Sequence, residues 1–145
     1  MLYSPLVLKA INIAFDAHAG QLDKAGIPYI THPLHVAESM DDEDSTVAAI
    51  LHDVVEDTAV TPEDLRKEGI TDYQIEVIRL LTHENGVPYM EYIEKLSKNE
   101  TARKVKLSDL RHNMDRGRLI TVTEKDEKRF AKYKKAYDFL ISMEK

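Results

Sequence analysis

The sequence of 145 residues contains no cysteine, which excludes disulfide bonds and thiolate metal ligands and fits a reducing cytoplasm. Glycine and proline are scarce, at five residues each, and no Gly/Ser-rich linker, internal repeat or low-complexity tract divides the chain. A chain of this length buries about 68–70% of its unfolded surface without covalent staples. We therefore expect residues 1–145 to form one domain.

The sequence also lacks a hydrophobic run long enough to span a membrane. The apolar N-terminal stretch 1–15 is interrupted by Pro5, Lys9 and Asn12, and no basic region precedes it. Gly20 follows where a helix would end. This pattern predicts a first helix rather than a signal peptide, and we expect a cytoplasmic protein with no membrane partner.

Basic residues are few in the first part of the chain. Residues 1–100 hold 7 Lys/Arg against 19 Asp/Glu, for a net charge of −12, whereas residues 101–145 hold 13 against 7, for +6. The acidic part argues against a nucleic-acid partner. The basic part either helps to hold a small anionic substrate beside a metal-binding acidic half, or attracts the acidic half during folding. The sequence leaves both alternatives open.

Apolar and polar residues do not alternate convincingly over the length of a strand, whereas helix-start signals recur. Ser4-Pro5, Thr61-Pro62, Thr71 with Gln74, and Thr123-Glu124 are examples. The last helix is expected to bury a stripe of four residues: Phe130, Tyr133, Tyr137 and Leu140. The sequence predicts an all-α, compact helical bundle of about seven helices.

The stretch 48–58 carries the chemistry. On an ideal helix its Val, Leu and Ile residues share one side, while His52, Asp53, Glu56 and Asp57 share the other. Adjacent imidazole and carboxylate groups can bind one divalent cation, and the two acids one turn later can handle a water that the cation activates. The alternative is an acidic solvent-facing side that carries His52 and Asp53 by chance.

One helix does not fill the coordination of a divalent ion, so further ligands must come from elsewhere in the fold. His32 lies at a predicted helix start, and Asp109 lies on an otherwise largely apolar helical segment. Each also has a purely structural interpretation, such as pairing of Asp109 with Arg111. Together with His52 and Asp53 they form a nitrogen and oxygen set suited to Mn, Fe, Co or Zn.

The order His32, His52-Asp53, Asp109 resembles the pattern of HD-domain phosphohydrolases. The closer resemblance is to the hydrolase domain of the RelA/SpoT family and to its single-domain members, the small alarmone hydrolases. Three stretches carry it, at 17–33 (AHAGQLDKAGIPYITHP), 46–58 (TVAAILHDVVEDT) and 105–115 (VKLSDLRHNMD). The family removes the 3′-pyrophosphate from guanosine tetra- or pentaphosphate, so the resemblance implies a metal-dependent enzyme with a nucleotide substrate.

The resemblance also implies roles for individual residues. One Mn²⁺, or another divalent transition metal, would be bound by His32, His52, Asp53 and Asp109. Glu56 and Asp57 would position or deprotonate the attacking water. Four residues would contact the substrate: Lys24, Asn113, Arg129 and Tyr133.

Alternatives remain at this stage. Asp23 stands where many relatives carry an arginine that packs against guanine, so the same chemistry on another nucleotide or phosphoester stays open. A non-catalytic nucleotide-binding module is a third hypothesis, which the intact Glu56 and Asp57 disfavour. Tyr29 is expected either to stack on a base or to pack in the core, and His112 has no expected role. The oligomeric state is not predicted.

Overall fold

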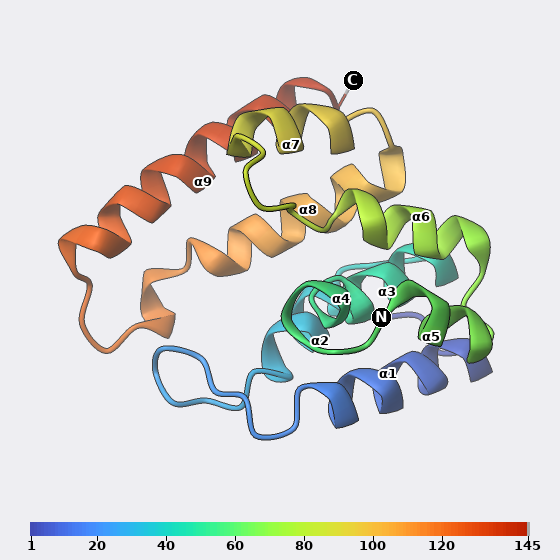
Figure 1. The fold of residues 1–145 in the computed structure, drawn as a ribbon. Helices are drawn as coiled ribbons and strands as arrows, with labels where there is room; N and C mark the ends of the chain where they lie inside the picture. The colour runs from blue at the N-terminus through green and yellow to red at the C-terminus, as the bar shows by residue number, and fades with distance from the viewer. Residues whose placement is uncertain (145) are drawn as a thin grey trace.

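A computed structural model describes residues 1–144, and their regular structure is helical throughout (Figure 1). An isolated antiparallel bridge between Leu22 and Pro28 is the extent of β-pairing in this part of the chain. The all-α prediction is confirmed. The elements are α1 (Pro5–Ala17), α2 (Thr31–Glu38), α3 (Glu43–Leu51), α4 (Val54–Asp57), α5 (Pro62–Lys67), α6 (Asp72–Leu80), α7 (Tyr89–Leu96), α8 (Glu100–Asn113), a 3-10 turn at Arg116–Arg118, and α9 (Glu124–Ser142).

The helices begin where the sequence signals predict. The side chain of Ser4 accepts a hydrogen bond from the backbone N–H of Val7, directly before Pro5 opens α1. Thr61, Thr71 and Thr123 each form a reciprocal capping box with the residue three positions later. These caps satisfy backbone N–H groups that a helix start leaves without partners.

Helix α3 is the most deeply buried element. Every residue from Ser45 to Leu51 is buried, because α3 packs against α1, α2, α6 and α8. Figure 1 shows α8 crossing the molecule between this group and α9, and α8 also packs against α2, α6 and α9. Side chains that leave α3 and α8 toward each other are therefore inside the bundle.

Residues 48–58 do not form the single continuous helix expected from the sequence. α3 ends at Leu51, a turn follows at His52 and Asp53, and α4 continues from Val54. Both turn residues keep right-handed helical dihedrals, and the N–H of Asp57 still donates to the carbonyl of Asp53 at 2.8 Å. The relative directions of the side chains therefore survive the break.

Two connections that are far apart in sequence lie on the same side of the molecule. The segment between α1 and α2 and the segment between α8 and α9 both extend to the left in Figure 1. Asp23 Oδ2 lies 3.7 Å from Arg118 Nη2, and Lys24 Nζ lies 3.4 Å from Asp126 Oδ1. Opposite charges from the acidic and basic parts of the chain thus meet here.

The side of helix α9 that packs on the bundle carries both buried and partly buried residues. Phe130 and Leu140 are buried as expected, whereas Tyr133 and Tyr137 are only partly buried. Over residues 1–144, no helix combines the length and the apolar character needed to cross a membrane.

The cap of α9 provides a test of the fold. We expect Thr123→Ala to lower the free energy of unfolding by about 1 kcal/mol, because the backbone N–H of Asp126 loses its side-chain acceptor. Thr123→Ser keeps that acceptor and should be close to wild type. Urea unfolding followed by circular dichroism measures both, and equal stability of the alanine and wild-type proteins would contradict the assigned cap.

Candidate metal centre and adjoining cavities

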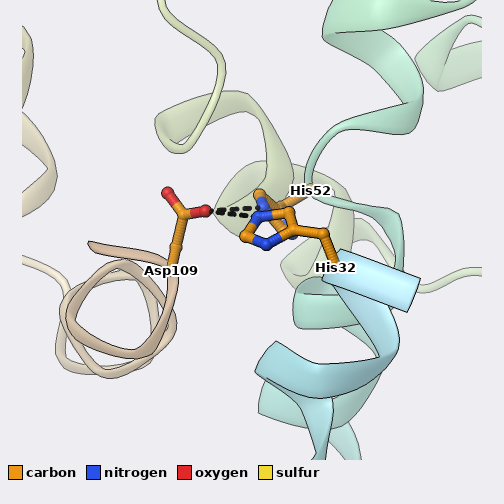
Figure 2. A group of neighbouring side chains, drawn as sticks. All are labelled: His32, His52 and Asp109. Carbon is orange, nitrogen blue, oxygen red and sulfur yellow. Dashed lines mark hydrogen bonds and ion pairs between the residues drawn. The ribbon is translucent and has the colours of Figure 1, made fainter. Parts of the chain in front are cut away.

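Three side chains from separate segments converge inside the bundle. His32 comes from α2, His52 from the turn directly after α3 and Asp109 from α8, and Figure 2 shows the carboxylate directed at both imidazoles. Asp109 Oδ1 lies 2.8 Å from His32 Nε2 and 3.3 Å from His52 Nε2. The three residues offer ligand atoms within 4.8 Å of one another, as binding of one cation requires.

Asp53 joins this centre from the turn between α3 and α4. Its Oδ2 atom lies 3.2 Å from His52 Nε2 and 3.8 Å from His32 Nε2. The hydroxyl of Tyr29 donates a hydrogen bond of 2.6 Å to the same oxygen, which fixes the carboxylate. The structure therefore brings together all four residues expected to bind metal.

The groups around the imidazole of His52 favour a cation at its Nε2 atom. Its Nδ1 atom lies 2.5 Å from the carbonyl oxygen of Ala49, which can only accept, so Nδ1 carries the hydrogen. Its Nε2 atom is buried, has no hydrogen-bond partner, and faces the carboxylates of Asp53 and Asp109. A lone pair opposite two anionic oxygens is unfavourable unless a metal ion or a proton lies between them.

The pKa of His52 reflects the same geometry. Burial favours the neutral imidazole, but the carboxylates of Asp53 and Asp109 outweigh burial and raise its pKa well above the ordinary value. In the absence of metal, a proton satisfies the two acids. A divalent cation at the same position would replace that proton with a stronger charge.

Asp109 is held as an anion in the interior. Burial favours its neutral form, but Lys106 and the two imidazoles outweigh burial and lower its pKa well below the ordinary value. The Nζ atom of Lys106 donates to Asp109 Oδ2 at 2.9 Å, and the amide of Asn113 donates to Oδ1 at 3.1 Å. These contacts fix the carboxylate and leave Oδ1 directed at the imidazoles.

Glu56 and Asp57 lie at the edge of the centre rather than inside it. Both side chains reach solvent on α4, and their carboxylates form a second group with Asp53, again within 4.8 Å. Glu56 Oε1 accepts the backbone N–H of His83 at 2.7 Å. Partial burial raises the pKa of both acids, and the Asp53 carboxylate raises it further. Both are thereby suited to take up a proton.

A cavity of about 550 Å³ opens beside these groups. Its acidic wall contains Asp53, Glu56, Asp57 and Asp109. Lys106 and Lys132 also line it, together with His83, Asn85, Asn113 and the tyrosines at 29, 89, 92 and 133. Cations and carboxylates thus face the same space, as binding of a phosphorylated molecule near a metal ion requires.

A second cavity, of about 270 Å³, shares the side chains of Tyr29, Asn113 and Tyr133 with the first. The four residues expected to contact substrate all line it: Lys24, Asn113, Arg129 and Tyr133. Asp126 interacts with Lys24 and Arg129 together, and the buried Nε atom of Arg129 has no partner. This end of the cavity retains a net positive charge.

Asp23 and Arg118 line another part of the same cavity. Asp23 Oδ1 accepts the backbone N–H groups of Ala25 and Ile27, each at 2.9 Å, so this residue also shapes the loop. Arg118 Nη1 donates to the carbonyl of His112 at 3.1 Å and to Asn113 Oδ1 at 3.2 Å. The pair is close to neutral overall, in contrast to the cationic end.

Sequence reasoning missed several residues of the site. Tyr29 donates a hydrogen bond to Asp53 and lines both cavities, whereas the sequence predicted that it stacks on a base or packs in the core. Lys106 precedes Asp109 by three residues, so helical spacing alone could have indicated their ion pair. Arg118 and His112 gave no comparable signal, because the site residues Asp23 and His32 that they contact come from a distant part of the chain.

Comparisons with known proteins agree with this architecture. A family described as "HD domain" matches residues 10–124. A guanosine-3′,5′-bis(diphosphate) 3′-pyrophosphohydrolase of Haemophilus influenzae is 34% identical over 116 residues, covering 70% of this chain and 17% of the relative. A GTP pyrophosphokinase of Streptomyces coelicolor is 36% identical over 140 residues, covering 83% of this chain and 16% of the relative. The chain thus spans about a sixth of the length of these relatives.

A solved structure described as a metazoan orthologue of SpoT that hydrolyzes ppGpp superposes with a TM-score of 0.78. It is 27% identical, and the match covers 97% of this chain and 88% of that one. Fold and site together define a helical domain built around paired histidines and aspartates. The chain belongs to the HD domain family, and its predicted resemblance to RelA/SpoT proteins is confirmed.

The centre predicts stabilisation by metal. With Mn²⁺ as the probe at 100 times its Kd, we expect the free energy of unfolding to rise by about 2.7 kcal/mol, reversibly with EDTA. Asp53→Asn keeps the size of the side chain but removes the charge, and should bind Mn²⁺ much more weakly. Asp138→Asn, an exposed change on α9, is the matched control. Thermal melting measures all three, and equal Mn²⁺ responses would exclude Asp53 as a ligand.

Proposed function

We propose that this protein is a metal-dependent phosphohydrolase that removes the 3′-pyrophosphate from guanosine tetra- or pentaphosphate, releasing pyrophosphate. The names of the Haemophilus relative and of the metazoan structure support this substrate. One observation carries the proposal: the imidazole and carboxylate centre, with its two outer acids, borders a cavity that adjoins a second one with a cationic end.

Mn²⁺ is the proposed cofactor, held by His32, His52, Asp53 and Asp109. Two nitrogens and two carboxylates suit Mn²⁺ and other divalent transition metals. When bound, the ion would supply a Lewis acid that neutralises phosphate oxygens and makes a water molecule more nucleophilic. The unpartnered Nε2 atom of His52 supports this assignment.

Glu56 and Asp57 are the proposed proton acceptors. A general base works best when its pKa is near the working pH, and partial burial moves both carboxyl groups in that direction. The backbone N–H of His83 orients Glu56 through Oε1, which leaves Oε2 for the water. The two acids lie outside the buried ligands, where water and substrate can enter.

The nucleotide is proposed to extend across both cavities. Its 3′-pyrophosphate would occupy the larger cavity beside Lys106 and Lys132, and its other phosphates would lie near Lys24 and Arg129. Asn113 and Tyr133 line both cavities, which suits contact with the ribose. Phosphates gain most from the cationic end, so the base is assigned to the nearly neutral Asp23 and Arg118 side.

The same chemistry on a nucleotide with a different base is the second candidate. The carboxylate of Asp23 lies in the nucleotide cavity, where it can accept a hydrogen bond from an amino or imino group of a base. Arg118 places a guanidinium 3.7 Å away, and it can donate to a ring nitrogen or a carbonyl. This pair has partners on guanine and on adenine alike.

Product analysis tests the reaction. Purified protein with Mn²⁺ and guanosine 3′,5′-bis(diphosphate) should release pyrophosphate, which ³¹P NMR distinguishes from orthophosphate. The adenosine analogue, run in parallel, measures base preference. Release of orthophosphate alone would contradict removal of an intact pyrophosphate, and faster turnover of the adenosine compound would favour the second candidate.

Glu56→Gln tests the proton acceptor. The amide keeps an oxygen for the His83 N–H but cannot take up a proton, so kcat should fall by about 10²–10⁴-fold. Mn²⁺ affinity should stay unchanged, because Glu56 is not among the proposed ligands. Glu91→Gln, at an exposed position on α7, is the control. Wild-type turnover in Glu56→Gln would remove this residue from the mechanism.

A further inference from the structure

His112 makes a direct contact with a proposed metal ligand. It lies on α8, and its Nδ1 atom is 2.7 Å from Nδ1 of His32. The two rings are within 5° of parallel, with centroids 5.0 Å apart. Because the two Nδ1 atoms are much closer than the centroids, the rings lie edge to edge in nearly one plane, joined by a hydrogen bond.

This bond constrains where the hydrogens are. A hydrogen bond between two imidazole nitrogens needs one donor and one acceptor. His32 Nε2 lies 2.8 Å from Asp109 Oδ1, and it must donate a hydrogen there when no metal is bound, because a carboxylate only accepts. A metal ion needs the same nitrogen without its hydrogen, so neutral His32 must then carry its hydrogen on Nδ1.

We propose that His112 is a positioning residue that keeps His32 hydrogen-bonded in both states. With metal bound, His112 Nδ1 accepts from His32 Nδ1–H; without metal, His112 Nδ1–H donates to His32. A carbonyl or a carboxylate could serve only the first arrangement, whereas an imidazole can serve both. This inference rests on the metal centre of the proposed function.

The surroundings of His112 support the role. The ring of His35 stacks on that of His112 with centroids 3.9 Å apart, which fixes its plane. Its side chain also borders a hollow of about 620 Å³.

His52 provides an internal contrast. Its Nδ1 hydrogen is committed to the carbonyl of Ala49, an acceptor that cannot donate in return. Nδ1 of His52 therefore stays the donor in this hydrogen bond whether or not a metal ion is bound. Of the two imidazole ligands, His32 alone has a partner able to reverse the direction of its hydrogen bond.

A matched pair of variants tests the proposal. Asn places an amide atom, and Leu a methyl group, close to the position of His112 Nδ1, because each is attached to Cγ. We expect His112→Leu to raise the Kd for Mn²⁺ by about 10–100-fold, since outer hydrogen-bond partners contribute that much to metal affinity. His112→Asn should stay within about threefold of wild type, because an amide both donates and accepts.

The direction of the bond is measured separately. In protein labelled with ¹⁵N-histidine and loaded with diamagnetic Zn²⁺, we expect a hydrogen on Nδ1 of His32 and none on Nδ1 of His112. The EDTA-treated protein should show the reverse. Finding no hydrogen on His32 Nδ1 in the Zn²⁺ form would overturn the proposal.

The measurements distinguish failure of the role of His112 from failure of the proposed reaction. Titration calorimetry gives the Mn²⁺ affinities, and melting in EDTA reports any loss of fold. Equal affinity of the Leu and Asn variants, or a change in the Leu variant explained entirely by lower stability in EDTA, would overturn the role of His112. Wild-type protein that binds Mn²⁺, with the expected Leu and Asn difference but no hydrolysis, would overturn the proposed reaction and support the role of His112.

Discussion

The arrangement of the helices around the site depends on the negative charge of Asp109, which lies inside the bundle. Asp109 is 4% exposed, and an ionised carboxylate at such a place costs several kcal/mol unless partners compensate for lost water. The compensation comes from α2, from the end of α3 and from α8 itself, through His32, His52 and Lys106. The packing of these helices that compensates the charge of Asp109 is therefore the same packing that brings the site residues together.

The charged groups around Asp109 continue into the two adjoining cavities. Lys106 occupies one oxygen of Asp109, and the other faces the imidazoles, where a divalent ion would add charge. Farther out, cations from the basic part of the chain lie beside a residue of the acidic part and beside a cavity. Arg118 pairs with Asp23 from the acidic part, while Arg129 borders a cavity and has a free buried Nε atom.

The sequence predicts which four candidate ligands meet, because His52 and Asp53 follow a strongly apolar helical stretch and His32 and Asp109 complete the spacing typical of HD domains. Periodicity indicates which side of such a helix is buried, and four polar residues on that helix have few structural explanations. Tyr29, Arg118 and His112 were beyond this reasoning. Tyr29 lies on an irregular connection, whose path has no period, and Arg118 lies on a single 3-10 turn between α8 and α9. His112 has a partner 80 positions away. Their contacts exist only once the helices have packed.

The break between α3 and α4 places the four polar residues of this stretch in two different environments. An unbroken helical face would treat His52, Asp53, Glu56 and Asp57 as one set. In the structure, His52 and Asp53 are buried, whereas Glu56 and Asp57 reach solvent one turn later. Burial favours the neutral form of Asp53, but the imidazoles of His52 and His32 outweigh burial and lower its pKa. Partial burial near the Asp53 carboxylate raises the pKa of the two outer acids. The proposed metal ligands and the proposed proton acceptors of this stretch thus lie within six consecutive residues and differ in their depth in the fold.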